Sequence, residues 1–137
     1  MGIIKTYNWE KAIALVLKID GWELEWVGDQ NLCYDLIGKT PKGYDCVMEI
    51  KMRDKYYEEK MIEKYKYDEL MKQNKVALYF VNDPKGNFLY WLNNIKMPKP
   101  VELYCPSTTL WSNKKKKKTV YLLKENDASI INLNRTY

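Results

Sequence analysis

Three charged residues, Asp35, Glu49 and Lys51, have a spacing that could build a metal-assisted hydrolytic site. They flank the turn sequence Pro41-Lys42-Gly43, and the runs on both sides of this turn are patterned as β-strands. In a hairpin centred on Lys42, Asp35 and Glu49 are equally far from the centre, so they face each other with Cβ atoms about 4.5–5.5 Å apart. Because side chains alternate along a strand, Lys51 projects on the same side as Glu49.

Two carboxylates facing each other repel, and like charges in this position destabilise a sheet unless another group compensates. A divalent cation would compensate, with Lys51 next to it. Asp45 is the competing acid, because it lies on the same strand and face as Glu49. At the usual rise of a strand, however, these two acids are about 13 Å apart. We therefore prefer Asp35 as the partner of Glu49.

The composition limits the class of protein and the available chemistry. A chain of 137 residues is long enough for one domain, and its fractions of 46% apolar and 30% charged residues are typical of a globular protein. No apolar run is long enough to span a membrane, and the N-terminus lacks a secretory pattern. The three cysteines have no metal-ligand spacing, so we expect reduced thiols, a cytoplasmic location and no membrane partner. The absence of histidine excludes serine-histidine catalysis and histidine-bound zinc.

The net charge of +5 comes from one local run, and without that run the chain is balanced. The run consists of Lys114, Lys115, Lys116, Lys117 and Lys118. Such a run favours polyanions, so these lysines are candidate DNA-binding residues. A solvated loop that keeps its flanks soluble explains the run equally well.

The order of expected elements predicts an α/β fold with a mixed sheet flanked by helices. Residues 8–18 have a helical apolar stripe behind Asn8 as N-cap, and residues 55–73, free of Gly and Pro, are predicted as one long helix. The chain is then expected to contain a helix at 8–18, strands at 22–26 and on both sides of Lys42, a helix at 55–73, strands at 76–81 and 88–92, and weaker segments at 119–123 and 128–133.

This αβββαβ order, with Asp35 on the second strand and Glu49-Ile50-Lys51 on the third, resembles the PD-(D/E)XK nuclease superfamily. That superfamily has the restriction-endonuclease-like fold and includes Holliday-junction resolvases and small phage nucleases. The resemblance covers a core of about residues 8–92, with residues 93–137 as a C-terminal extension of a single domain, 1–137. Tyr34 replaces the proline of the family name, at a position that varies often.

The resemblance implies a metal site and a mechanism. Asp35, Glu49 and the backbone carbonyl of Ile50 would bind Mg²⁺, for which Mn²⁺ would substitute. Lys51 would orient the attacking water or stabilise the charge that develops on the phosphate. The alternative is a hairpin with one exposed cluster of cross-strand ion pairs.

Two further residues are auxiliary candidates. Glu10, on the first helix, matches a position where many members of the superfamily carry another acid, although a solvent-facing glutamate is an equally good interpretation. Ile62, Lys66 and Leu70 share one face of the helix predicted at 55–73, so Lys66 is expected to face the sheet and reach the active site. A lysine that extends to solvent is the alternative for Lys66.

These observations predict a Mg²⁺-dependent DNA endonuclease that hydrolyses phosphodiester bonds. The alternatives are a nucleic-acid-binding module that does not cleave and a protein-interaction factor, such as an inhibitor of host defence, on the same fold. The complete set of Asp35, Glu49 and Lys51 argues against a degenerate site, which usually loses one member. The resemblance further implies DNA as partner, allows a homodimer, and places a phage-encoded chain in the host cytoplasm.

Overall fold

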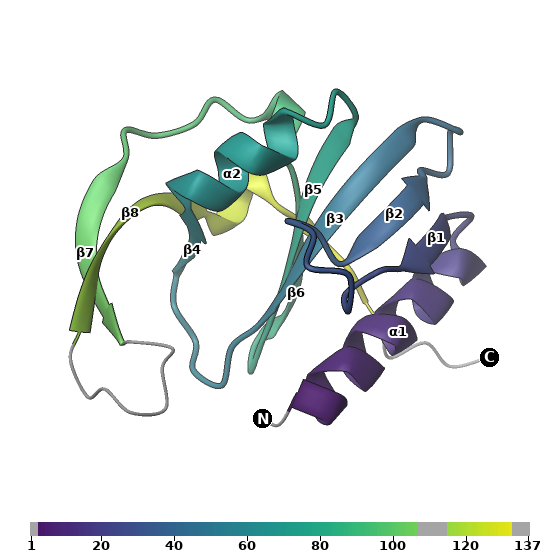
Figure 1. The fold of residues 1–137 in the computed structure, drawn as a ribbon, viewed down its shortest axis with the longest axis horizontal. Helices are drawn as coiled ribbons and strands as arrows, with labels where there is room; N and C mark the ends of the chain where they lie inside the picture. The colour runs from purple at the N-terminus through teal and green to yellow at the C-terminus, as the bar shows by residue number, and fades with distance from the viewer. Residues whose placement is uncertain (1–2, 107–114, 133–137) are drawn as a thin grey trace.

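A six-stranded mixed sheet forms the centre of the fold, and a three-stranded antiparallel sheet stands beside it (Figure 1). The computed structural model describes residues 3–106 and 115–132. In chain order, its elements are α1 (Ile3–Ile19), β1 (Glu23–Trp26), β2 (Leu36–Lys39), β3 (Asp45–Met52), β4 (Glu59–Glu63), α2 (Lys64–Met71), β5 (Val76–Asp83), β6 (Gly86–Trp91), η1 (Leu92–Asn94), β7 (Val101–Pro106), β8 (Lys115–Lys124), η2 (Glu125–Asp127) and β9 (Ser129–Ile130).

The central sheet has the strand order β1-β2-β3-β5-β6-β9, and the second sheet has the order β4-β8-β7. Among the strands of residues 3–106 and 115–132, only the β3–β5 pair is parallel, because the chain crosses over between these two strands through β4 and α2. The other pairs are antiparallel. The fold class predicted from the sequence, a mixed sheet with helices packed against it, is therefore confirmed.

Side-chain alternation along the central strands builds two cores, one on each face of the sheet. On β5, Ala77, Tyr79 and Val81 point into the core shared with α2 and the second sheet, and Leu78 and Phe80 point into the core shared with α1. A strand buried on both faces in this way has a continuous apolar sequence. The face that a residue occupies on β3 or β5 thus decides which helix it can reach.

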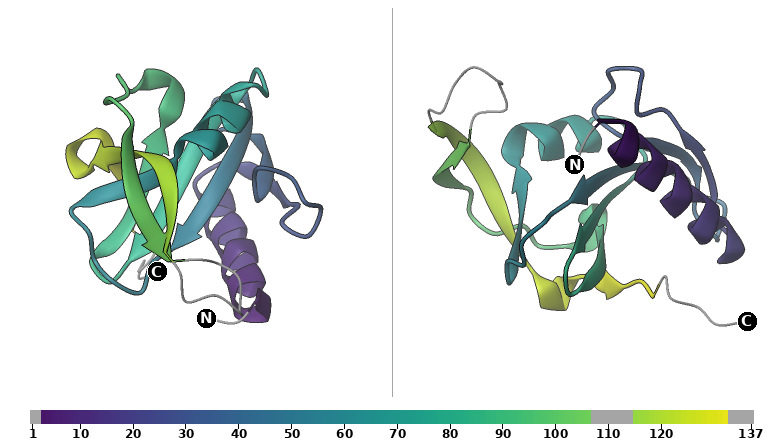
Figure 2. Two further views of the ribbon diagram at one scale, coloured as in Figure 1. Left: turned by 60° about the vertical axis from the view of Figure 1, so that its left-hand side comes forward. Right: turned by 90° about the horizontal axis from the view of Figure 1, so that it is seen from below.

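The two helices occupy different parts of the molecule. From α1, Ile13 and Leu17 are buried against one face of the central sheet, whereas Leu70 of α2 is buried on the other face. The helix α2 bridges the central sheet and the second sheet, and the β7–β8 hairpin and α1 lie at opposite ends of the molecule (Figure 1 and Figure 2). No helix in the described part of the chain is long and apolar enough to cross a membrane.

The hairpin register predicted from Lys42 is confirmed. Leu36 pairs with Met48, and Lys39 pairs with Asp45, so the two strands are symmetric about the expected turn. Gly43 has a φ of 89°, a conformation that favours glycine, and its amide donates to the Thr40 carbonyl at 2.9 Å. The paired residues end at Leu36 and Met48, so Asp35 lies directly before β2 and not on that strand, where the sequence had predicted it.

The predicted long helix at residues 55–73 is wrong in its first half. Residues Glu59–Glu63 form the strand β4, in which Lys60 and Ile62 are buried and their neighbours are more exposed. This strand exists because it pairs with β8, with Ile62 opposite Tyr121. The run is free of Gly and Pro and locally favours a helix, but the pairing with a distant strand overrides that preference.

A buried ion pair holds β4 in place. Lys60 Nζ lies 2.6 Å from Asp83 Oδ2 at the end of β5 and also donates to the Tyr57 carbonyl at 2.6 Å. Both side chains are almost fully buried, at 2% and 1% exposure. The ammonium also lies 4.1 Å from the centre of the Phe88 ring. These contacts fasten the segment between β3 and β4 to the central sheet.

Two other expectations need correction at their boundaries. The first helix begins at Ile3, so Asn8 lies inside α1 and does not cap it. The strand expected at 119–123 begins earlier, at Lys115, and pairs with β7, which the sequence did not predict. Lys114 lies outside the described residues.

Candidate active site

Asp35 and Glu49 meet at the open end of the β2–β3 hairpin. The Asp35 amide donates to the Met48 carbonyl at 2.9 Å, and the Asp35 carboxylate accepts a 2.8 Å hydrogen bond from the Ile50 amide through Oδ2. Glu49 lies within β3, opposite Tyr79 of β5, and is only 7% exposed. The hairpin therefore brings Asp35, directly before β2, next to Glu49 in the central strand β3.

Lys66 reaches this pair from α2. Its Nζ lies 2.7 Å from Glu49 Oε1, and its side chain is 37% exposed. Lys66 thus contacts Glu49, although the helical face used to predict this does not exist, because Ile62 belongs to β4; its catalytic role stays a prediction. Lys66 faces the sheet because Leu70, on the same face of α2, is fully buried.

Lys51 and Arg53 extend from the same end of β3. They line a small hollow of about 30 Å³ together with Glu49, Lys66, Met61, Ile62, Glu63 and Tyr79. Arg53 was not among the predicted residues, yet the alternation that relates Glu49 to Lys51 continues to it. The sequence pattern could therefore have found this second cation.

The pKa values of both Asp35 and Glu49 are raised above their ordinary values. Burial and, after it, the nearby Asp35 carboxylate raise the pKa of Glu49 to about 7, although the Lys66 ammonium opposes them. Burial also raises the pKa of Asp35, although the Ile50 amide and the Lys66 ammonium offset part of this effect. Both carboxylates are thus held in a setting that disfavours their charged forms.

The pKa values of Lys51 and Lys66 are shifted in opposite directions. Loss of water around Lys51 lowers its pKa, and the positive charges of Arg53 and Lys66 lower it further. Partial burial alone would lower the pKa of Lys66, but the Glu49 and Asp35 carboxylates overcome this and raise it. Lys66 is therefore the cation that neutralises the acids, and Lys51 is the one whose proton is held less firmly.

Glu10 is buried beside the same cluster. It is 5% exposed, and its Oε1 accepts a 2.8 Å hydrogen bond from Trp26 Nε1. Burial raises the pKa of Glu10 despite the Trp26 hydrogen bond, and the Asp35 charge adds to the increase. The loop after β1 passes so close that a Cβ at Gly28 would lie 2.7 Å from Glu10 Oε1. The solvent-facing interpretation of Glu10 is therefore wrong.

Asp45, the competing acid, is separate from the cluster. It lies at the start of β3, where its Oδ1 is 2.9 Å from Lys39 Nζ, and both side chains are exposed. This cross-strand pair lowers the pKa of Asp45. The geometry thus selects Asp35 as the partner of Glu49.

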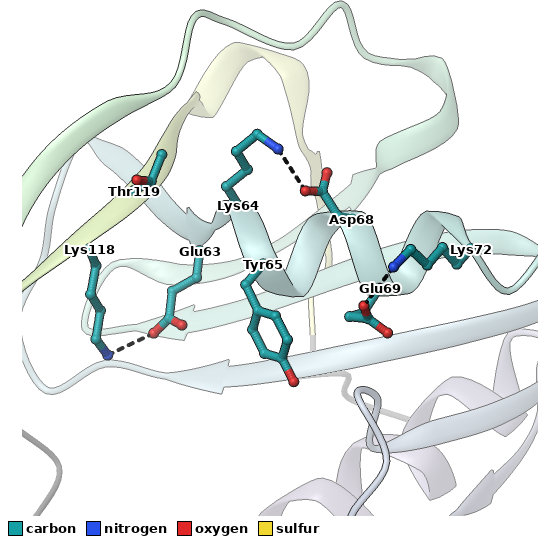
Figure 3. A pocket seen from close by; sticks show the side chains of 8 residues that line it. All are labelled: Glu63, Lys64, Tyr65, Asp68, Glu69, Lys72, Lys118 and Thr119. Carbon is teal, nitrogen blue, oxygen red and sulfur yellow. Dashed lines mark hydrogen bonds and ion pairs between the residues drawn. The ribbon is translucent and has the colours of Figure 1, made fainter.

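The lysine run is divided between the two faces of β8. Lys118 Nζ lies 2.9 Å from Glu63 Oε1, a contact that Figure 3 shows beside the paired charges of α2. Lys117 points the other way and lies 2.9 Å from Glu102 Oε2. Lys115 and Lys116 belong to the same strand. A strand cannot present consecutive lysines as one patch, so a shared role of the run in DNA binding stays a prediction.

Among the described residues, no group of three or more His, Cys, Asp or Glu side chains is arranged to hold a metal ion. The candidate ligands are therefore the two carboxylates of Asp35 and Glu49 together with the Ile50 carbonyl.

Comparison with solved structures finds the same fold. The chain is similar to Hjc, a Holliday junction resolvase from the archaeal hyperthermophile Archaeoglobus fulgidus, with a TM-score of 0.61 and 11% sequence identity. The match covers 93% of this chain and 92% of that chain. Comparisons with protein-family models and with curated proteins find no match. This likeness confirms the fold that the resemblance to the PD-(D/E)XK nuclease superfamily implied.

Proposed function

We propose that this protein is a Mg²⁺-dependent DNA endonuclease that hydrolyses phosphodiester bonds. The observation that carries the proposal is the pairing of the half-buried Asp35 with the buried Glu49, with the Lys66 ammonium 2.7 Å from Glu49. A buried carboxylate next to a second carboxylate is costly to maintain without a function. Its position in a fold shared with a resolvase makes phosphodiester hydrolysis the reaction that best explains it.

The donor set fits Mg²⁺. Mg²⁺ in proteins is usually bound by one or two carboxylates and keeps its other positions for water and substrate phosphate. Asp35, Glu49 and the Ile50 carbonyl supply oxygen ligands only, so Mn²⁺ should substitute for Mg²⁺. Burial, followed by repulsion from Asp35, raises the pKa of Glu49 to about 7, and a bound cation would offset both effects. When bound, the cation would polarise the phosphate and acidify a water molecule.

The protein's own side chains would carry out the other tasks of the reaction. Asp35 is held in place by the Ile50 amide, and Glu49 is held by Lys66, so both acids have a defined orientation. Lys51 lies beside them with a lowered pKa, which suits it to orient the attacking water and to stabilise negative charge on the phosphate. Glu10, fixed by Trp26, would support the cluster as an auxiliary acid.

The test is a cleavage assay with Mg²⁺ on single-stranded, double-stranded and branched DNA. We expect Asp35→Asn and Glu49→Gln to abolish cleavage while the fold survives. Asp45→Asn is the matched control, because it removes an exposed carboxylate from β3, the strand that carries Glu49, and should leave the cleavage rate unchanged. A wild-type protein that binds DNA without cutting any of these forms would favour a binding module. Cleavage by Asp35→Asn at the wild-type rate would remove the assignment.

The partner and the setting follow from the same proposal. DNA is the substrate, and a homodimer is the arrangement in which a chain of this size could cut two strands. A cytoplasmic location, in a host cell if the chain is phage-encoded, stays a prediction from the sequence.

A further inference from the structure

A groove adjoins the proposed active site where the end of β3 faces the second sheet. Its volume is about 530 Å³, and residues from the β3–β4 segment, β4, β7 and β8 line it. It shares Lys51, Arg53, Met61 and Glu63 with the small hollow that contains Glu49. The groove is therefore continuous with the hollow at Glu49, and a ligand bound in the groove would extend to the site where a phosphate would react.

The groove is positively charged. Lys51, Arg53 and Lys55 line it from the β3 side, and among the described residues none of the three forms an ion pair with a carboxylate. Lys118 and Glu63 neutralise each other, as do Lys60 and Asp83. The exposed Glu59 offsets one of the three remaining charges. The balance favours an anionic ligand with several charges.

Two exposed tyrosines also line the groove. Tyr57 follows β3 and is 58% exposed, and Tyr104 belongs to β7 and is 69% exposed. They belong to segments on different sides of the groove, the β3–β4 segment and the second sheet. Aromatic rings beside a cationic groove are the usual platform for stacking unpaired bases.

We propose that this groove binds an unpaired DNA strand next to the phosphate that is cut. The proposal rests on the proposed nuclease function and names its substrate as DNA with a single-stranded portion. The bases of a duplex are already stacked on each other and cannot also stack on Tyr57 and Tyr104. A volume of about 530 Å³ is in the range of small-ligand pockets, which suits a short unpaired stretch better than a duplex.

The test measures binding in the absence of cleavage. Fluorescence anisotropy with EDTA compares a labelled single-stranded oligonucleotide with the blunt duplex of the same sequence. We expect Tyr57→Ala and Tyr104→Ala each to weaken single-strand binding by about 5- to 150-fold, the effect of losing one stacked base. Tyr57→Phe and Tyr104→Phe keep the ring and should retain the affinity, while duplex binding should change little in all four variants.

Two further variants make the test specific. Tyr44→Ala removes a ring that is 62% exposed but lines a different cavity, on the turn at the other end of β3, and should not change binding. Lys55→Gln should reduce the log-log salt dependence of single-strand binding by about 0.7, the contribution of one phosphate contact. A loss of affinity in Tyr44→Ala equal to that in Tyr57→Ala would overturn the proposal.

The outcomes separate this inference from the nuclease assignment. If both alanine variants bind single strands as the wild type does, or if they lose duplex binding equally, the groove is not a site for an unpaired strand. If tyrosine-dependent binding is found but no DNA form is cut with Mg²⁺, the groove stands and the nuclease function fails. If DNA is cut and both alanine variants bind single strands normally, the nuclease function stands and the groove proposal fails.

Discussion

Replacing Glu49 by glutamine should make the metal-free protein less sensitive to pH. Burial, with the Asp35 charge, raises the pKa of Glu49 from an ordinary 4.5 to about 7. Between pH 4.5 and about 7, Glu49 is therefore protonated in the folded protein but largely ionised in the unfolded chain. Glutamine has nearly the same shape and can still accept a hydrogen bond from Lys66, so the substitution removes mainly the ionisation.

The sign and the size follow from proton linkage. Because the pKa of Glu49 is higher in the folded state, its contribution to stability is fully present below pH 4.5 and is lost as the pH rises through about 7. At about 1.36 kcal/mol per pH unit of displacement, the loss is about 3 kcal/mol. We expect the free energy of unfolding of the wild type to fall by about this much more than that of Glu49→Gln over this range.

The assay is urea unfolding followed by tryptophan fluorescence at a series of pH values with EDTA. Adding Mg²⁺ at neutral pH should stabilise the wild type, because a ligand that binds only the folded state raises its stability, but should not stabilise Glu49→Gln. Glu25→Gln, a substitution of an exposed glutamate on β1, is the control and should follow the wild type throughout.

Two results would refute this reasoning. One is a parallel fall in stability for the wild type and Glu49→Gln, which would mean that Glu49 ionises normally in the folded state. The other is equal stabilisation of both proteins by Mg²⁺, which would place the cation elsewhere.

Three further predictions test other parts of the structure. Lys66→Met should preserve folding and lower the cleavage rate by about 10²-fold or more, the effect of losing one charge-stabilising donor; a wild-type rate would remove its role. Lys60→Met leaves the buried Asp83 without its partner, so urea unfolding should show a loss of about 3–5 kcal/mol, whereas Lys39→Met, in an exposed pair, should change the stability little. Replacing Lys114–Lys118 by serine should flatten the salt dependence of duplex binding by about 0.9 per lost phosphate contact; an unchanged slope would leave the run a solubilising segment.

Local rules predicted the centre of the site. The turn at Pro41-Lys42-Gly43 set the hairpin register, which ends next to Asp35, and strand alternation placed Glu49 and Lys51 on one face of β3. These relations depend on short sequence separations and on the period of a strand, both of which are visible in the sequence.

Tertiary structure decided the rest, because it depended on pairings between distant segments. Only β8, some sixty positions along the chain, makes residues 59–63 a strand, and only the folded α1 and the β1–β2 loop bury Glu10 beside Trp26. The raised pKa of Glu49 likewise depends on how much water the surrounding elements exclude. Sequence spacing can predict which acids lie close together. Burial is a property of the complete fold, and it determines how strongly the charged forms of those acids are disfavoured when no cation is bound.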